Sequence, residues 1–163
     1  MLERLEQSIF AIKSLLLNEG DIRKLLCNSS NNCLNMTAPT LEEAQNYITL
    51  KPIYQFENKD YEQNGMINLY YTELTPDDEV DTAVSGTLQV NVVYNVDKWE
   101  LVDNKIRVIQ LSNKIIKLLN NKKFNVSNQL TFASMQELII SKTVVGYALL
   151  FSITDGNSNL QNF

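Results

Sequence analysis

The first part of the chain carries apolar residues at helical spacing. Within residues 2–18 they recur every three or four positions: Leu2, Leu5, Ile9, Ile12 and Leu16. Such a stripe is typical of an amphipathic helix that buries one side against a core, and Gly20 ends it. Further along, Thr40 and Glu43 have the spacing of a capping box, which predicts a short helix ending near Tyr47.

The middle of the chain changes to the alternation that is typical of β-strands. Residues 87–96 place apolar side chains at every second position, with polar side chains between most of them. A weaker alternation over residues 66–74 predicts a second strand. Residues 49–54 predict a strand at a sheet edge, because Pro52 has no N–H to donate to a neighbouring strand. An acidic loop, residues 75–81, joins the strands 66–74 and 87–96.

A second long amphipathic helix is predicted over residues 105–120. Its apolar stripe is wide, and lysines occupy the remaining face and the last turn, where the helix dipole favours them. Asp103 or Asn104 is expected to cap its N-terminus. Two further β segments follow, residues 128–141 with an interruption after Phe132, and residues 143–154.

This order of elements predicts an α+β fold. We expect an antiparallel β-sheet of about four to five strands packed against two long amphipathic helices, because short loops between successive strands favour antiparallel pairing. A length of 163 residues suits a single domain. Within it we expect a helical N-terminal region (1–48), a sheet–helix–sheet core (49–154) and a flexible tail (155–163).

The charge of the chain limits its partners. A net charge of −5 argues against general nucleic-acid binding, because proteins of that class usually carry a basic face. Residues 55–104 hold eleven carboxylates and only two lysines, whereas residues 105–123 hold six basic residues and no acidic one. Patches of opposite charge allow copies of one protein to dock. The alternative is two solvated faces without a partner.

The N-terminus and the cysteines indicate a protein made in the cytosol. The charged first residues lack the apolar centre of a signal peptide, and no apolar run reaches the roughly 18 residues of a membrane span. Cys27 and Cys33 fit neither a CxxC redox motif nor a four-ligand zinc site, and the chain has no histidine to complete one. We therefore expect no metal site.

The sequence also predicts no enzymatic activity. General acid–base and nucleophilic catalysis most often use histidine, which is absent. The acidic loop carries four carboxylates, those of Asp77, Asp78, Glu79 and Asp81. They lie at a loop tip, where solvent screens them and no apolar surroundings raise the pKa of one above that of another. Five scattered glycines build no phosphate-binding loop, so we expect no cofactor and no catalytic residue.

Four residues are candidates for a subunit interface. Trp99 is the only tryptophan; it is either a packing residue at the junction of sheet and helix or an anchor for a partner. Arg107 lies in the first turn of the second long helix, where it opposes the dipole, so we expect an acidic partner in this chain or a neighbour. The other two candidates are Lys114 and Lys117, on the same helix as Arg107.

Three segments together resemble a known family. They are Gly65–Tyr71 (GMINLYY), Leu88–Trp99 (LQVNVVYNVDKW) with a helix opening Ile106–Arg107 after it, and Val145–Phe151 (VGYALLF). Their succession over residues 52–154 is similar to that of small neck proteins of tailed bacteriophages, in particular tail terminators and tail-completion proteins. In that family a strand ending in an aromatic residue leads to a long basic helix, and the last strand carries a glycine–aromatic–apolar run.

The resemblance implies a virion structural protein at the head–tail interface, made in the host cytoplasm. It implies a ring, usually a hexamer, that caps the tail tube, stops its polymerisation and joins it to the head. The implied partners are further copies of the chain, the tail tube protein, a head-completion or connector protein, and the tail sheath in a contractile phage. No membrane is involved. DNA would pass through without specific binding, and the acidic loop would suit the wall of the lumen.

Two alternatives stay open at this point. The chain could be another head–tail connector or head-completion protein, which ring stoichiometry and binding to the portal rather than to the tail tube would distinguish. It could also be a monomeric, non-viral cytosolic binding module, which neighbouring genes would distinguish.

Overall fold

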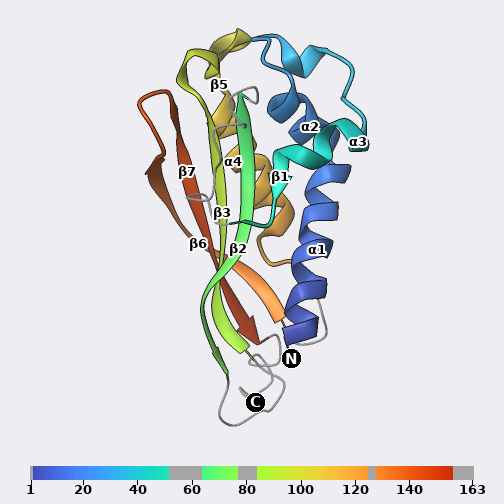
Figure 1. Ribbon diagram of the computed structural model, residues 1–163, viewed down its shortest axis with the longest axis vertical. Helices are drawn as coiled ribbons and strands as arrows, with labels where there is room; N and C mark the ends of the chain where they lie inside the picture. Colours follow the sequence, from blue (N-terminus) through green and yellow to red (C-terminus); the bar gives the residue numbers. More distant parts are fainter. Residues whose placement is uncertain (1, 52–63, 77–83, 125–127, 156–163) are drawn as a thin grey trace, which may run out of the picture.

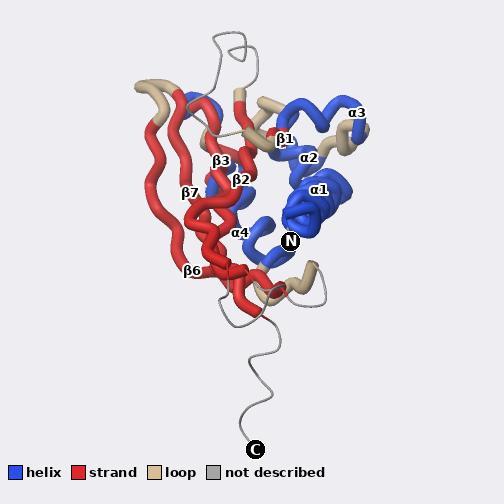
Figure 2. Tube along the Cα trace, turned by 60° about the horizontal axis from the view of Figure 1, so that its bottom comes forward, coloured by secondary structure: helices blue, strands red, loops and turns tan. Residues whose placement is uncertain are grey.

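The computed structural model describes residues 2–51, 64–76, 84–124 and 128–155. A β-sheet forms one layer, and helices form a second layer against one of its faces (Figures 1 and 2). The helices are α1 (Leu2–Asn18), α2 (Gly20–Cys27), α3 (Leu41–Ala44) and α4 (Arg107–Leu119). The strands are β1 (Ile48–Thr49), β2 (Gly65–Pro76), β3 (Val84–Asn95), β4 (Glu100–Leu101), β5 (Lys105–Ile106), β6 (Asn128–Ile139) and β7 (Val144–Asp155).

The predicted fold class is wrong in two respects. The main sheet has five strands in the order β1-β2-β3-β7-β6, and it is mixed, because β1 runs parallel to β2 while the other neighbours are antiparallel. Strands β4 and β5 form a separate two-stranded sheet. The helical layer consists of shorter pieces rather than two long helices: in the described residues, helices of 17, 8, 4 and 13 residues share it.

The local helix signals are confirmed except at Gly20 and at the start of α4. Helix α1 ends at Asn18, and Gly20, predicted to end it, is the first residue of α2. Helix α1 has the predicted bounds, and Thr40 and Glu43 form the predicted capping box at α3. Helix α4 begins at Arg107 and has no side-chain cap. Asp103 and Asn104, the predicted caps, have φ angles of 63° and 58° and form a left-handed turn before it. This turn connects β4 to β5, which pair with each other, and α4 begins only after β5.

The alternation in the central strand is confirmed and locates the core. Leu88, Val90 and Val92 of β3 are fully buried and face the helical layer. Their partners in the neighbouring strand β7 include Phe151 and Leu149, which are also fully buried. No described helix covers the opposite face of the sheet (Figure 2).

The edges of the sheet differ in length. β1 lies at one edge of the sheet, as predicted for the strand over residues 49–54, but it has only two residues. Positions 52–54 of the predicted strand lie outside the described residues. β6, with 12 residues, forms the other edge. Its predicted interruption is a β-bulge between Phe132 and Ser134, so one bent strand replaces two segments.

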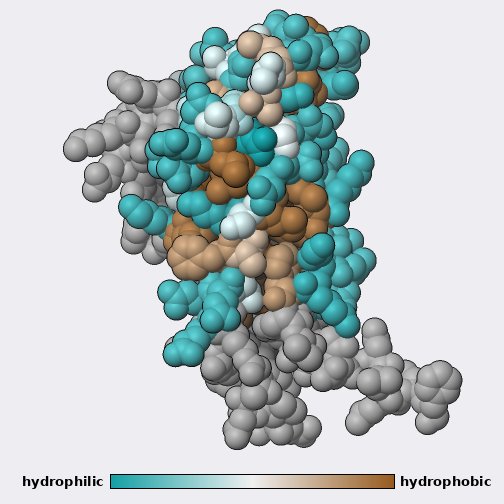
Figure 3. All heavy atoms as spheres, turned by 90° about the vertical axis from the view of Figure 1, so that its right-hand side faces the viewer, coloured by the Kyte–Doolittle hydropathy of each residue, from teal (hydrophilic) through white to brown (hydrophobic). Residues whose placement is uncertain are grey.

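Seen from the side of α1, hydrophobic side chains form a band across the middle of the surface, below a mostly hydrophilic upper end (Figure 3). In the described part of the chain, no helix is long and apolar enough to cross a membrane.

Candidate assembly interface

Arg107, a predicted interface residue, lies inside the protein. Its side chain is 0% exposed. The guanidinium donates hydrogen bonds to four backbone carbonyl oxygens at 2.6–2.8 Å, those of Leu25, Asn28, Ser30 and Lys98. It therefore connects the start of α4 to the end of α2 and to the loop that follows α2.

This buried cation has no carboxylate among the partners that the structure describes, contrary to the expectation of an acidic partner. Two of its acceptors, the carbonyls of Leu25 and Asn28, belong to the last turn and C-cap of α2, where the helix dipole is negative. The ring of Tyr94 lies 4.7 Å from the guanidinium carbon and adds a cation–π contact. Arg107 thus caps a distant helix, and its side chain does not reach the subunit surface.

Trp99 packs at the junction of sheet and helix, the first of its two alternatives. Its Nε1 donates to the carbonyl of Tyr94 at 3.1 Å, and its ring lies 6.5 Å from that of Tyr147. The Trp99 carbonyl accepts from the backbone N–H of Arg107 at 2.8 Å. The structure therefore brings two predicted site residues together, with Arg107 buried and Trp99 partly buried against the core.

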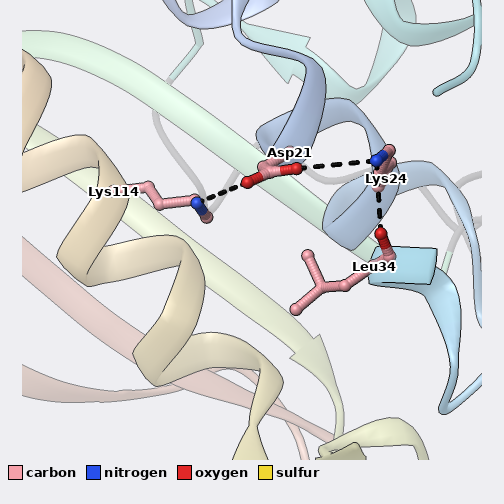
Figure 4. Close-up of polar contacts among 4 residues, drawn as sticks. All are labelled: Asp21, Lys24, Leu34 and Lys114. Atoms are coloured by element: carbon pink, nitrogen blue, oxygen red, sulfur yellow. Dashed lines mark hydrogen bonds and ion pairs between the residues drawn. The ribbon is translucent and has the colours of Figure 1, made fainter.

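Lys114 and Lys117 point to different surroundings. The Nζ of Lys114 lies 2.7 Å from a carboxylate oxygen of Asp21 in α2, and Asp21 also approaches Lys24 at 3.7 Å (Figure 4). Lys114 therefore stabilises the contact between two helices of one subunit. Lys117, almost one turn later, is exposed and remains a candidate for an intermolecular contact. The acidic loop, with Asp77, Asp78, Glu79 and Asp81, lies outside the described residues.

Replacing Asp21 by asparagine is expected to lower stability slightly and only above acidic pH. The hydrogen bond from Lys114 lowers the pKa of Asp21 below its usual value of about 4. Because the folded-state pKa is lowered, the stabilisation is present above the unfolded-state pKa and is lost as pH falls through the folded-state pKa. The Asp21 side chain is 39% exposed, so solvent limits the effect to about 0.5 kcal/mol.

Urea unfolding at neutral pH and near pH 2 would test this. The exposed carboxylate of Glu42 supplies the matched control, Glu42→Gln. A difference between wild type and Asp21→Asn that persists undiminished at the lower pH would contradict the assignment of the ion pair.

Half of the edge strand β6 is covered by the chain that follows α4. Leu130 donates its N–H to the carbonyl of Lys122 and accepts from the N–H of Asn121, at 3.0 and 2.7 Å. Asn120 Oδ1 accepts from the N–H of Phe132 at 2.9 Å. This first half of β6 therefore has partners on both of its sides.

Beyond the bulge, the outer side of β6 has no backbone partner within the described residues. The N–H of Ile140 donates to the carbonyl of Val144, which fixes the pairing with β7 at the end of the strand. Because hydrogen-bonded and non-bonded pairs alternate along an antiparallel ladder, the backbone groups of Met135, Glu137 and Ile139 point outward. Such an unpaired edge is a template for another chain.

The side chains of this open stretch are also suited to contact. Ile139 is 64% exposed, the largest value among the exposed large apolar side chains of the described residues. Met135 packs partly against the core, and Glu137 is exposed. An open backbone edge next to an exposed isoleucine is a candidate interface for another protein chain.

Comparison with known protein families now places the chain. The family model YomW matches residues 19–153. The chain belongs to the YomW family. The family's name suggests a phage protein and states no molecular role. No curated protein matches the chain.

The YomW match begins directly after α1 and contains α4, the open edge and all of the main sheet except the last two residues of β7. Helix α1 nevertheless contributes to the core of the protein through Leu5, Ile12 and Leu16, which are at most 5% exposed. The matched region therefore relies on a segment outside it to cover part of the sheet.

Both cysteines are free thiols, Cys27 half-buried and Cys33 buried. Burial raises the pKa of Cys27 to about 11, with the Glu43 charge also raising it and Arg23 opposing, so this thiol is protonated at neutral pH. Cys33 is fully buried and accepts a hydrogen bond from Arg107 Nη1 at 3.3 Å. Within the described ranges, no cluster of three potential metal ligands occurs.

Sequence reasoning missed the open edge of β6. One signal was available, since Leu138, Ile139 and Ile140 are consecutive apolar residues and a strand must turn at least one of them to each face. Which strand would lie at the edge depends on the strand order, which no local pattern reports.

Proposed function

We propose that this protein is a virion structural protein of the phage neck, a tail terminator whose copies form a ring that caps the tail tube and joins it to the head. The observation that carries the proposal is the open half of β6 with its exposed Ile139, in a family whose name suggests a phage protein. A protein that acts by assembly needs such a surface, whereas a monomeric module usually protects its sheet edges.

The distribution of charge supports a ring rather than a symmetric dimer. A closed ring uses heterologous interfaces, in which one patch of a subunit meets a different patch of the next. The exposed lysines of the described chain include Lys117, Lys122 and Lys123, on or just after α4, whereas α1 and α3 present exposed glutamates. Helix α1 also carries the partly exposed Lys13, so the clearer acidic patch is α3, with Glu42 and Glu43. Two different patches with opposite charge suit head-to-tail contact.

Mass measurement by light scattering, with and without tail-tube subunits of the same phage, tests the proposed function. We expect either a ring in solution or a monomer that assembles only on tubes. Tubes from an unrelated phage serve as the control, because a specific cap should not bind them. A protein that ignores its own tubes but binds the portal or connector would contradict the terminator assignment and favour a connector.

A further inference from the structure

We propose that the open half of β6, residues 135–139, binds residues 156–163 of a second copy of this chain as an added strand. Residues 156–163 follow β7 and have the sequence GNSNLQNF. The sheet of one copy would then continue into the next copy through backbone hydrogen bonds. This inference rests on the proposed function in one respect, that copies of the protein associate, and it names the two segments that make the contact.

The backbone of the open half selects an extended segment as its occupant. β6 forms one edge of the sheet (Figure 1). Within the described residues, the outward backbone groups of Met135, Glu137 and Ile139 have no backbone partner. Another extended strand satisfies such a row of donors and acceptors, whereas a helix has already paired its own backbone groups. Residues 156–163 contain no proline, so each of them keeps the N–H that a strand donates.

The side chains beside the open half are apolar on both faces of the sheet. Ile139 is 64% exposed on the side of the helical layer. Leu138 lies on the opposite side, where it packs partly against Met66. A strand added here therefore meets apolar neighbours on both of its faces. Leu160 and Phe163 are three positions apart, so an extended backbone turns one of them to each face.

Residues 156–163 cannot line the open half of their own copy. β7 ends at Asp155, which lies opposite Asn128 at the start of β6. The open half begins roughly 23 Å further along β6 and is itself roughly 13 Å long, at about 3.3 Å per residue. Eight extended residues reach at most about 29 Å. The route also follows the first half of β6, whose outer side is hydrogen-bonded to Asn121 and Lys122. A second copy is under no such limit.

Pairing of the open half with the open half of a second copy is less favourable. Two antiparallel β6 edges use all three outward residues only in the register that places Glu137 opposite its own copy. Like charges directly opposite each other destabilise a pair of strands. Residues 156–163 carry no charged side chain, so they meet Glu137 without this repulsion. The contact is therefore between two different surfaces, as a ring requires.

Disulfide formation between two variants tests the contact. Ile139→Cys is mixed with Ser158→Cys, Leu160→Cys or Asn162→Cys, three alternate positions that sample the registers on one face. The mixtures are oxidised at the concentration, or on the tail tubes, at which wild type assembles. We expect a disulfide-linked dimer in at least one mixture, and peptide mapping should place the bond between position 139 and the segment 156–163.

Wild type and Met36→Cys are the controls for this experiment. Wild type reports the background from its own thiols, one buried and one half-buried. Met36 is an apolar residue that is 44% exposed and belongs to neither segment, so Met36→Cys should give no linked dimer with Leu160→Cys.

The strength of association gives a second readout. Ile139→Lys removes the exposed apolar side chain and places a charge on the edge, which is how natural edge strands avoid pairing. We expect association at least about tenfold weaker than that of wild type, with an unchanged thermal midpoint because the position is exposed. Met36→Lys adds the same charge elsewhere and should associate like wild type.

The remaining outcomes separate this inference from the proposed function. A linked dimer of Ile139→Cys alone would show that two β6 edges pair, and it would overturn the inference. So would a double variant, Ile139→Cys with Leu160→Cys, that links only within one chain. If no mixture links although wild type caps tail tubes, the segments are wrong and the neck function stands. If the link forms but the assembly ignores tail tubes, the contact is right and the terminator function fails.

Discussion

Replacing Arg107 by methionine is expected to destabilise the protein by about 3–5 kcal/mol, because it removes the donor of a buried network of hydrogen bonds. Methionine fills part of the volume but leaves the four carbonyl acceptors without their donor, and each buried unsatisfied group costs about 1–3 kcal/mol. Total stabilities are about 5–15 kcal/mol, so the variant should be close to unfolding. Urea unfolding followed by circular dichroism measures the difference.

Arg107→Lys separates charge from geometry in the same experiment. Lysine keeps the positive charge but offers a compact ammonium group instead of a planar fork of five donors, so we expect it to recover only a small part of the loss. Lys117→Met is the matched control, because it removes a cation from the exposed face of the same helix and should change stability by less than about 0.5 kcal/mol. An Arg107→Met variant within about 1 kcal/mol of wild type would show that the hydrogen bonds of Arg107 contribute little to stability.

Replacing Gly146 by alanine is expected to cost about 3 kcal/mol or more, or to prevent folding. A Cβ at this position would lie 1.8 Å from the carbonyl oxygen of Val92 and 2.8 Å from Val93 Cα. Both contacts are with backbone, so no side chain can move aside, and β7 would have to separate from β3 in the centre of the sheet. The soluble yield and the thermal midpoint report this effect.

Gly20→Ala is the control for the glycine experiment. Its added Cβ would meet Ala38 Cβ at 3.7 Å, an ordinary contact, at the first residue of α2. Alanine also favours helix over glycine by up to about 1 kcal/mol, so this variant should be neutral or slightly stabilised. A Gly146→Ala protein as stable as Gly20→Ala would mean that β3 and β7 are not packed as closely as described.

The pattern along the chain determined those features that depend on near neighbours. The stripe of α1, the capping box of Thr40 and the alternation of β3 each depend on residues a few positions apart, and each was confirmed. A helix or strand shows its period locally because the period follows from backbone geometry.

Only the tertiary structure decided the features that join distant residues. The acceptors of Arg107 in α2 and in the loop after it lie 77–82 positions away in sequence. The local pattern, which predicted an acidic partner, carries no information about contacts between residues so far apart. The parallel pairing of β1 and the position of β6 at an edge follow from the strand order, which is a choice among whole-chain packings. The candidate interface exists because that choice left half of β6 unpaired within the described residues, and burial of the common core, rather than any local signal, selects the arrangement.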